Sequence, residues 1–186
     1  MSRTSRHLPF EAAGFDDPLE MLLGCHRRIE KQLAILKQLK AEVAERGASP
    51  EASAAALSLL GYFDRAAVHH HEDEEHDLFP LLEARITDPG EQARFEAFRG
   101  TLAHDHRTLR DAWSRLRRSL EAIADGRSRP LPAEEDVQAF VGAYAQHILA
   151  EENALTDFFN RWLDDSDRER LGAAMAARRL HAARRG

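Results

Sequence analysis

Apolar residues recur every three or four positions along the first part of the chain, with charged and polar residues between them. The series, which includes one histidine, is Leu19, Leu22, Leu23, His26, Ile29, Leu33, Leu36 and Leu39. Residues with this spacing lie on one face of an α-helix. Asp17 followed by Pro18 is a typical helix start, and Gly47 suits the left-handed conformation that ends many helices. The pattern predicts a long helix with one buried face over residues 18–46.

Three further helices follow from the same periodicity and from the turn signals between them, which are Asp88-Pro89-Gly90, the loop after Gly126 and the cap-rich residues 164–167. The expected ranges are Ser49 to Leu81, Glu91 to Asp125 and Pro132 to Leu163. Pro80 lacks a backbone N–H, so we expect it to mark a kink or the last turns of the second helix.

No segment alternates apolar and polar residues with the period of a β-strand. Four long amphipathic helices with short connections predict an all-α protein, an antiparallel up-down four-helix bundle over residues 16–163. Residues 1–15 are expected to form an irregular N-terminal arm, and residues 164–186 a C-terminal helix or tail. The Arg-rich end of this tail is expected to be solvated, with docking to an acidic partner as the alternative.

The composition is that of an ordinary globular domain. The 186 residues are 43% hydrophobic and 31% charged, and the formal net charge is -6. Because this charge lacks a concentrated basic excess, we expect no nucleic-acid partner. Cys25 is the single cysteine, which excludes an internal disulfide and fits a cytoplasmic location. We see no signal peptide and no membrane span, so no membrane contact is expected.

The chain contains ten histidines, and four of them belong to a weak internal duplication. Each copy has a lone histidine on one helix and the sequence His-x3-Glu-Glu on the next. The copies are His26 with His70, Glu74 and Glu75, and His106 with His147, Glu151 and Glu152. The four histidines and the first glutamate of each motif are six polar groups within apolar stripes. Such a duplicated set indicates a shared site rather than isolated core histidines.

The spacing of this repeat suits a metal centre. Residues four apart on a helix lie on the same face, so each His-x3-Glu pair aims an imidazole and a carboxylate at one point. Burying two carboxylates without a cation is costly. The set suits two ions, each held by two imidazoles, with both carboxylates bridging, and it favours iron over zinc, manganese or copper. The predicted metal ligands are His26, His70, Glu74, His106, His147 and Glu151.

One competing frame lies within the second helix. His71 with Glu75 also has the His-x3-Glu spacing, but only His70 with Glu74 aligns with the fourth helix, so we prefer the latter pair. The remaining histidines of these helices are expected to be exposed or to face another side, namely His69, His76 and His104.

Three other residues near the predicted ligands have two interpretations. Tyr144 is one turn before His147 and either approaches the metal site or is an ordinary core residue. Glu30 is one turn after His26 and either accepts a hydrogen bond from its imidazole or is a surface charge. Cys25 is expected to be a small buried or half-buried residue, with redox sensing as the alternative.

These motifs resemble those of the hemerythrin-like, or HHE cation-binding, domain family. The resemblance rests on His26, the run His-His-Glu-Asp-Glu-Glu-His-Asp-Leu-Phe-Pro at residues 70–80, His106 and residues 147–152. It covers about residues 16–163. It implies a four-helix bundle with two non-haem iron ions that are joined by an oxo or hydroxo bridge.

The resemblance is closer to one branch of the family than to another. Oxygen-carrying hemerythrins have a second histidine four residues before the one that matches His106, where this chain has Leu102. They also end with His-x4-Asp, whereas His147 is followed by Glu151. The four-His, two-Glu set is more similar to the branch that repairs iron–sulfur clusters.

The expected function is a non-haem di-iron protein that binds, senses or scavenges a small ligand such as oxygen, nitric oxide or peroxide. One alternative is a di-iron enzyme that turns over peroxide or nitric oxide, or donates iron in stress repair. The other is a helical interaction module with zinc or no metal. The sequence shows neither a nucleophile–base pair nor a phosphate-binding loop.

Overall fold

The structure, a computed structural model, describes residues 14–128 and 132–184. All regular structure in these residues is helical, with no strand among them, which confirms the all-α prediction. The segments are α1 (Pro18–Arg46), α2 (Pro50–Gly61), the π-helical turn η1 (Tyr62–Ala66), α3 (Ala67–Asp73), the π-helical turn η2 (Glu74–Leu78), α4 (Phe79–Arg85), α5 (Pro89–Ala124), α6 (Glu134–Trp162) and α7 (Asp165–Ala183). Most of the predicted N-terminal arm lies outside the described residues. Within the described ranges no helix is long and apolar enough to cross a membrane.

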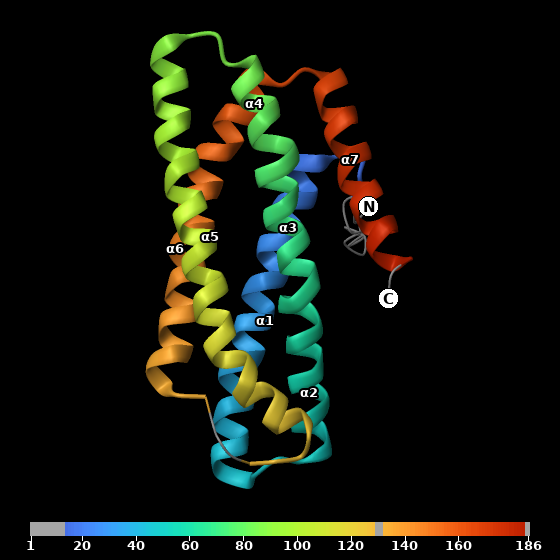
Figure 1. Cartoon of the computed structure of the whole chain (residues 1–186), viewed down its shortest axis with the longest axis vertical. Helices are drawn as coiled ribbons and strands as arrows, with labels where there is room; N and C mark the ends of the chain where they lie inside the picture. The colour runs from blue at the N-terminus through green and yellow to red at the C-terminus, as the bar shows by residue number, and fades with distance from the viewer. Residues whose placement is uncertain (1–13, 129–131, 185–186) are drawn as a thin grey trace, which may run out of the picture.

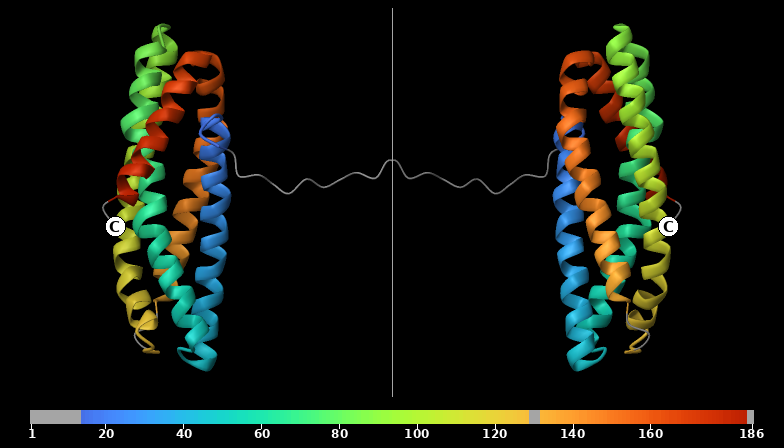
Figure 2. Two further views of the ribbon diagram at one scale, coloured as in Figure 1. Left: turned by 90° about the vertical axis from the view of Figure 1, so that its right-hand side faces the viewer. Right: turned by 90° about the vertical axis from the view of Figure 1, so that its left-hand side faces the viewer.

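Four long helical rods lie side by side. The chain runs down α1, up the continuous rod α2–α4, down α5 and up α6 (Figure 1). α1 packs against α2 and α6, and α5 packs against the same two elements. The two side views show the same arrangement, with α7 lying against the outside of the rods (Figure 2).

Three of the four rods, all except α6, begin close to the predicted positions, and a side chain caps the first turn of each of these three. In each case a Ser or Asp precedes a Pro and accepts a hydrogen bond from a backbone N–H three residues later, which would otherwise lack a partner. The bonds are Glu20 N to Asp17 (3.1 Å), Ala52 N to Ser49 (3.1 Å) and Glu91 N to Asp88 (2.9 Å).

The second rod differs from the prediction in two ways. It continues past Leu81 to Arg85, and it is interrupted by the two π-helical turns. In η2 the N–H of Phe79 bonds back five residues to the carbonyl of Glu74. Each such turn holds one more residue than an α-helical turn, so the side-chain register changes along this rod. The prediction of a rod that ends at Leu81 was wrong because Pro80 lies within the first turn of α4, where its missing N–H is tolerated.

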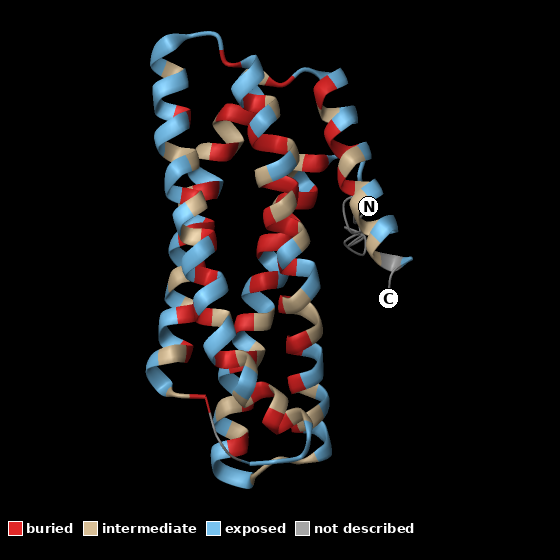
Figure 3. Cartoon of the chain, viewed as in Figure 1, coloured by how far each residue is buried: buried red, intermediate tan, exposed pale blue. Residues whose placement is uncertain are grey.

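The core consists of two apolar clusters, one toward each end of the rods. The first includes Leu33, Phe63, Leu116 and Phe140, and the second includes Leu22, Leu78, Phe95 and Phe158. Buried positions follow the inner faces of the rods (Figure 3). On α1 the boundary between the clusters lies between Leu22 and Ile29, and His26 occupies it. The predicted ligands therefore form a polar layer between two apolar ones.

The C-terminal segment docks on the rods instead of ending in solvent. α7 contacts α1, α3 and η2. Arg178 Nε lies 2.9 Å and an Arg179 terminal nitrogen 2.7 Å from the carboxylate of the buried Asp73. A Cβ on Gly172 would lie 2.0 Å from the carbonyl oxygen of Phe15, so only glycine allows this approach. The expectation of a solvated Arg-rich end was wrong for Arg178 and Arg179, because a buried carboxylate requires their charges.

Candidate metal centre

The six predicted ligands meet in the polar layer between the two clusters. They come from all four rods, and each side chain is at most 1% exposed. Their positions are His26 on α1, His70 on α3, Glu74 at the start of η2, His106 on α5, and His147 and Glu151 on α6. The structure thus brings together every residue of the predicted set.

Each buried carboxylate contacts two histidines. Glu74 lies 3.1 Å from Nε2 of His70 on its own rod and 3.4 Å from Nε2 of His106 on α5. Glu151 lies 3.3 Å from Nε2 of His147 on its own helix and 3.2 Å from Nε2 of His26 on α1. In both copies of the repeat, the glutamate links the histidine of its own frame to a lone histidine.

The ligand atoms fall into two groups, each within 4.8 Å. The first is formed by His26, His70, Glu74 and Glu151, and the second by His71, His106 and His147. Glu74 contacts His70 of the first group and His106 of the second, and Glu151 likewise contacts one histidine of each. Each carboxylate therefore links a histidine of one group to a histidine of the other.

His71 is the residue that the sequence analysis missed. It is 6% exposed, its ring stacks on His106 with centroids 4.0 Å apart, and it lies 5.6 Å from the ring of His147. The preference for His70 over His71 assumed that only one of two adjacent residues faces the interior. The burial of Ala67, His70, His71 and Asp73 shows that α3 is instead enclosed on several sides. The competing His-x3-Glu frame was the available signal.

The Nδ1 atoms of the two lone histidines, His26 and His106, form hydrogen bonds with the second glutamate of a motif. Glu152 accepts from Nδ1 of His26 at 3.0 Å, and Glu75 is bonded to Nδ1 of His106. Such bonds fix the tautomer that leaves Nε2 as the free ligand atom and increase its basicity. Glu30, which was considered for this role, is exposed and is a surface charge.

The atoms that face the centre lack hydrogen bonds within the described structure. These atoms are Nε2 of His26, His70, His71, His106 and His147 and both carboxylate oxygens of Glu74 and Glu151. Buried polar groups without partners are rare and costly in proteins. Bound metal would give these atoms the partners that they lack, so the residues fit a metal site.

The pKa shifts of the metal-free centre also fit a metal site. Burial, and next the charge of Glu151, raises the pKa of Glu74 well above its usual range. Burial lowers the pKa of His70 and of His71 well below the ordinary value, and that of His147 to about 4. His70, His71 and His147 are therefore kept neutral, the form that coordinates a metal.

A small apolar cavity of about 40 Å³ adjoins the second group. His71 and Tyr144 line it together with Phe63 and Trp113. The ring of Tyr144 lies 6.3 Å from that of His71 and 6.4 Å from that of His147, and burial raises the pKa of its hydroxyl. Tyr144 therefore lies beside the second group and also belongs to the first apolar cluster, so the two interpretations of this residue do not exclude each other.

The other candidates lie away from the centre. His76 and His104 are exposed, as predicted. His69 was expected to be exposed but is half-buried in a separate pocket beside α7. Cys25 is buried, as predicted, and Arg28 donates a hydrogen bond to its sulfur at 3.0 Å. Burial raises the pKa of this thiol.

Comparison with known proteins gives two findings. The sequence pattern of the hemerythrin HHE cation-binding domain matches residues 17–159. An uncharacterized protein of Haemophilus influenzae is 28% identical over 171 residues, which are 92% of this chain and 95% of that protein. The matched range includes all six predicted ligands and the whole of the polar layer. The chain therefore belongs to the hemerythrin HHE cation-binding domain family.

Proposed function

We propose that the four rods form the up-down four-helix bundle of this family and hold a pair of non-haem iron ions. One ion would be bound by His26 and His70, and the other by His106 and His147. Glu74 and Glu151 would bridge them. The observation that carries the proposal is that each glutamate contacts one histidine of each group. A single ion would leave one group of unpaired buried nitrogens without a partner.

His71 is the fifth histidine of the proposed site. Its unpaired Nε2 and its grouping with His106 and His147 support a role as a ligand to the second ion. The two positions would then differ, with two histidines at one and three at the other. Mixed imidazole and carboxylate sets of this size suit iron, whereas zinc prefers four ligands in a tetrahedron.

The proposed ligand is small: oxygen, nitric oxide or peroxide. The cavity beside His71 has a volume of about 40 Å³. A single water molecule requires only about 10–15 Å³, so the cavity has room for a diatomic molecule. Ferrous iron with an open coordination position supplies the affinity for such molecules. Because the pKa of Tyr144 is raised, its hydroxyl stays protonated and is available as a hydrogen-bond donor at the cavity.

The surrounding residues orient and protect the site. Glu75 and Glu152 hold the two lone histidines through their Nδ1 atoms. Apolar clusters above and below exclude bulk water, which strengthens the electrostatic contacts within the layer. The cavity of about 40 Å³ beside His71 is far smaller than the roughly 300–1,000 Å³ that usually holds an organic ligand.

The test is metal analysis of protein produced with ample iron, with absorption spectra before and after reduction and exposure to air. The proposal predicts about two iron ions per chain and near-ultraviolet absorption that changes reversibly. A His106→Ala variant should lose iron, whereas His104→Ala, which alters an exposed histidine on the same helix, should not. Stoichiometric zinc, or no metal, would contradict the proposal. Steady turnover of peroxide or nitric oxide would indicate an enzyme, and stable adducts would indicate binding or sensing.

A further inference from the structure

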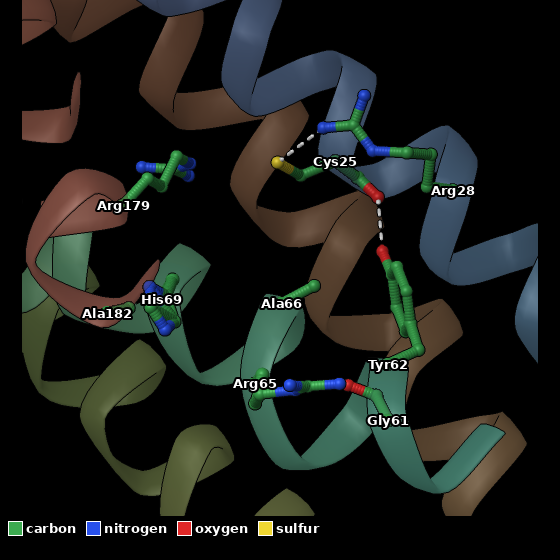
Figure 4. A pocket seen from close by; sticks show the side chains of 9 residues that line it. All are labelled: Cys25, Arg28, Gly61, Tyr62, Arg65, Ala66, His69, Arg179 and Ala182. Atoms are coloured by element: carbon green, nitrogen blue, oxygen red, sulfur yellow. Dashed lines mark hydrogen bonds between the residues drawn. The ribbon is translucent and has the colours of Figure 1, made fainter. Parts of the chain in front are cut away.

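A second pocket lies on the outer side of the rods, where α7 covers α1 and the second rod. Its volume is about 450 Å³. Cys25 and Arg28 of α1, Tyr62 and Arg65 of η1, His69 of α3 and Arg179 of α7 line it (Figure 4). The π-helical turn η1 forms one wall, and such turns are frequent at functional sites.

Two guanidinium groups in this pocket have no acidic partner among the described residues. Arg28 donates to the sulfur of Cys25, and Arg65 donates to the carbonyl oxygen of Gly61 at 3.4 Å. Neither forms an ion pair with a carboxylate in the described ranges, and no lining residue carries a carboxylate. Two positive charges without an acidic partner thus lie at one concavity of a chain whose net charge is -6.

The third arginine of the pocket, Arg179, is held in place by contacts with the rest of the fold. Arg179 is fixed by the buried Asp73, with contacts of 2.7 and 3.2 Å, and by the carbonyl of Met175 at 2.8 Å. Asp73 balances the charge of Arg179, and these contacts fix its position beside Cys25. Figure 4 shows Arg179 across the pocket from Arg28. The pocket does not depend on a loop for its shape, because every lining residue belongs to a helix or a π-helical turn.

One imidazole nitrogen of the pocket also lacks a partner. The Nδ1 atom of His69 is buried and makes no hydrogen bond within the described structure. Buried polar atoms of this kind are normally paired, so this nitrogen is available to a bound molecule. The hydroxyl of Tyr62 is already used, since it donates to the carbonyl of Cys25 at 3.5 Å.

We propose that this pocket, formed around Arg28, Arg65 and His69, binds a small organic oxyanion. Arginine presents a planar set of donors that matches a carboxylate or a phosphate, and this match accounts for the anionic group. Ala66, Ala182 and the ring of Tyr62 supply an apolar wall for the rest of the ligand. A pocket of this volume is in the range that takes organic ligands. The inference does not depend on the metal proposed above.

The test is isothermal titration of the full-length, metal-loaded protein at low salt with three related probes: phenyl phosphate, benzoate and benzyl alcohol. One anion or both should bind at one per chain, and the uncharged alcohol should not. Binding of phenyl phosphate alone would assign a phosphate ester, and binding of benzoate as well would show that a carboxylate suffices. Higher salt should weaken the binding.

Variants locate the binding. Arg28→Ala and Arg65→Ala should each weaken it by about tenfold to a hundredfold, the usual loss for a charge-assisted hydrogen bond. The matched control is Arg107→Ala, an exposed arginine on α5 outside the pocket, which should leave the affinity unchanged. Melting temperature and metal content verify that each variant is folded. The proposal is overturned if neither anion binds, or if both pocket variants bind as tightly as the control.

Discussion

The substitution His71→Leu distinguishes two roles for this residue, metal ligand and packing residue. The two roles predict opposite changes in the stability of the metal-free protein. The side chain is buried and its Nε2 has no partner within the described structure. An unsatisfied buried polar group costs about 1–3 kcal/mol, and leucine of similar size removes it. Loss of the stacked contact with His106 offsets about 0.5–1.5 kcal/mol of this gain. We expect the metal-free variant to be more stable by about 1 kcal/mol, the difference of these two ranges.

The metal-loaded protein should respond in the opposite direction. Saturating metal stabilises a folded protein in proportion to the logarithm of its affinity, so each tenfold loss of affinity removes about 1.4 kcal/mol. Residues that merely support metal ligands already contribute tenfold to a hundredfold in affinity. The increase in unfolding free energy on adding metal should therefore fall by at least about 1.4 kcal/mol in the variant.

Urea unfolding under anaerobic conditions, with and without excess ferrous iron, measures both quantities. The control is His76→Leu, which alters an exposed histidine of the same rod and should change neither. The reasoning is refuted if His71→Leu lowers the stability of metal-free and metal-loaded protein equally. That result would make His71 a packing residue.

Three further predictions concern the bridge, the buried histidines and the docking of α7. Glu151→Gln should lower the iron content from about two to at most one per chain, because a neutral amide cannot bridge two cations; metal analysis would show this, and two retained irons would contradict it. In metal-free protein, His147 takes up its proton only near pH 4 when folded but near 6.5 when unfolded, so its pKa shift makes stability fall as pH drops through this interval. His147→Leu should reduce the slope of the unfolding free energy between about pH 6 and 4.5 by about 1 kcal/mol per pH unit, and an unchanged slope would refute the assignment. Gly172→Ala should lower the unfolding free energy by about 1–3 kcal/mol because the added Cβ would meet the backbone of Phe15. The control Gly142→Ala, which has open space around the added Cβ, should raise the unfolding free energy by about 0.5–1 kcal/mol. Equal effects of the two substitutions would contradict the close approach of Gly172 to Phe15.

The rods and the cluster of buried histidines and glutamates could be predicted from the sequence because the signals for both are local. Caps such as Asp17 and Ser49 act locally, and the apolar stripes follow helical geometry. The duplicated His-x3-Glu-Glu motif also contained the supporting residues, although their role was not recognised. In both copies the second glutamate, Glu75 or Glu152, holds a lone histidine of the neighbouring rod.

The remaining features depend on contacts between distant segments. The π-helical turns change the register of the second rod, and no residue type in the sequence specifies them. His71 faces the site because α3 is enclosed by its neighbours, which a single apolar stripe does not predict. The docking of α7 depends on the ion pairs of Arg178 and Arg179 with Asp73, more than 100 residues away in the sequence.

We propose above all that two iron ions lie side by side, one at each group of histidines. Anomalous diffraction at the iron edge from crystals of iron-loaded protein tests this most directly. The account predicts two peaks, one beside His26 and His70 and the other beside His106 and His147. A single peak, or a signal at the zinc edge only, would contradict it.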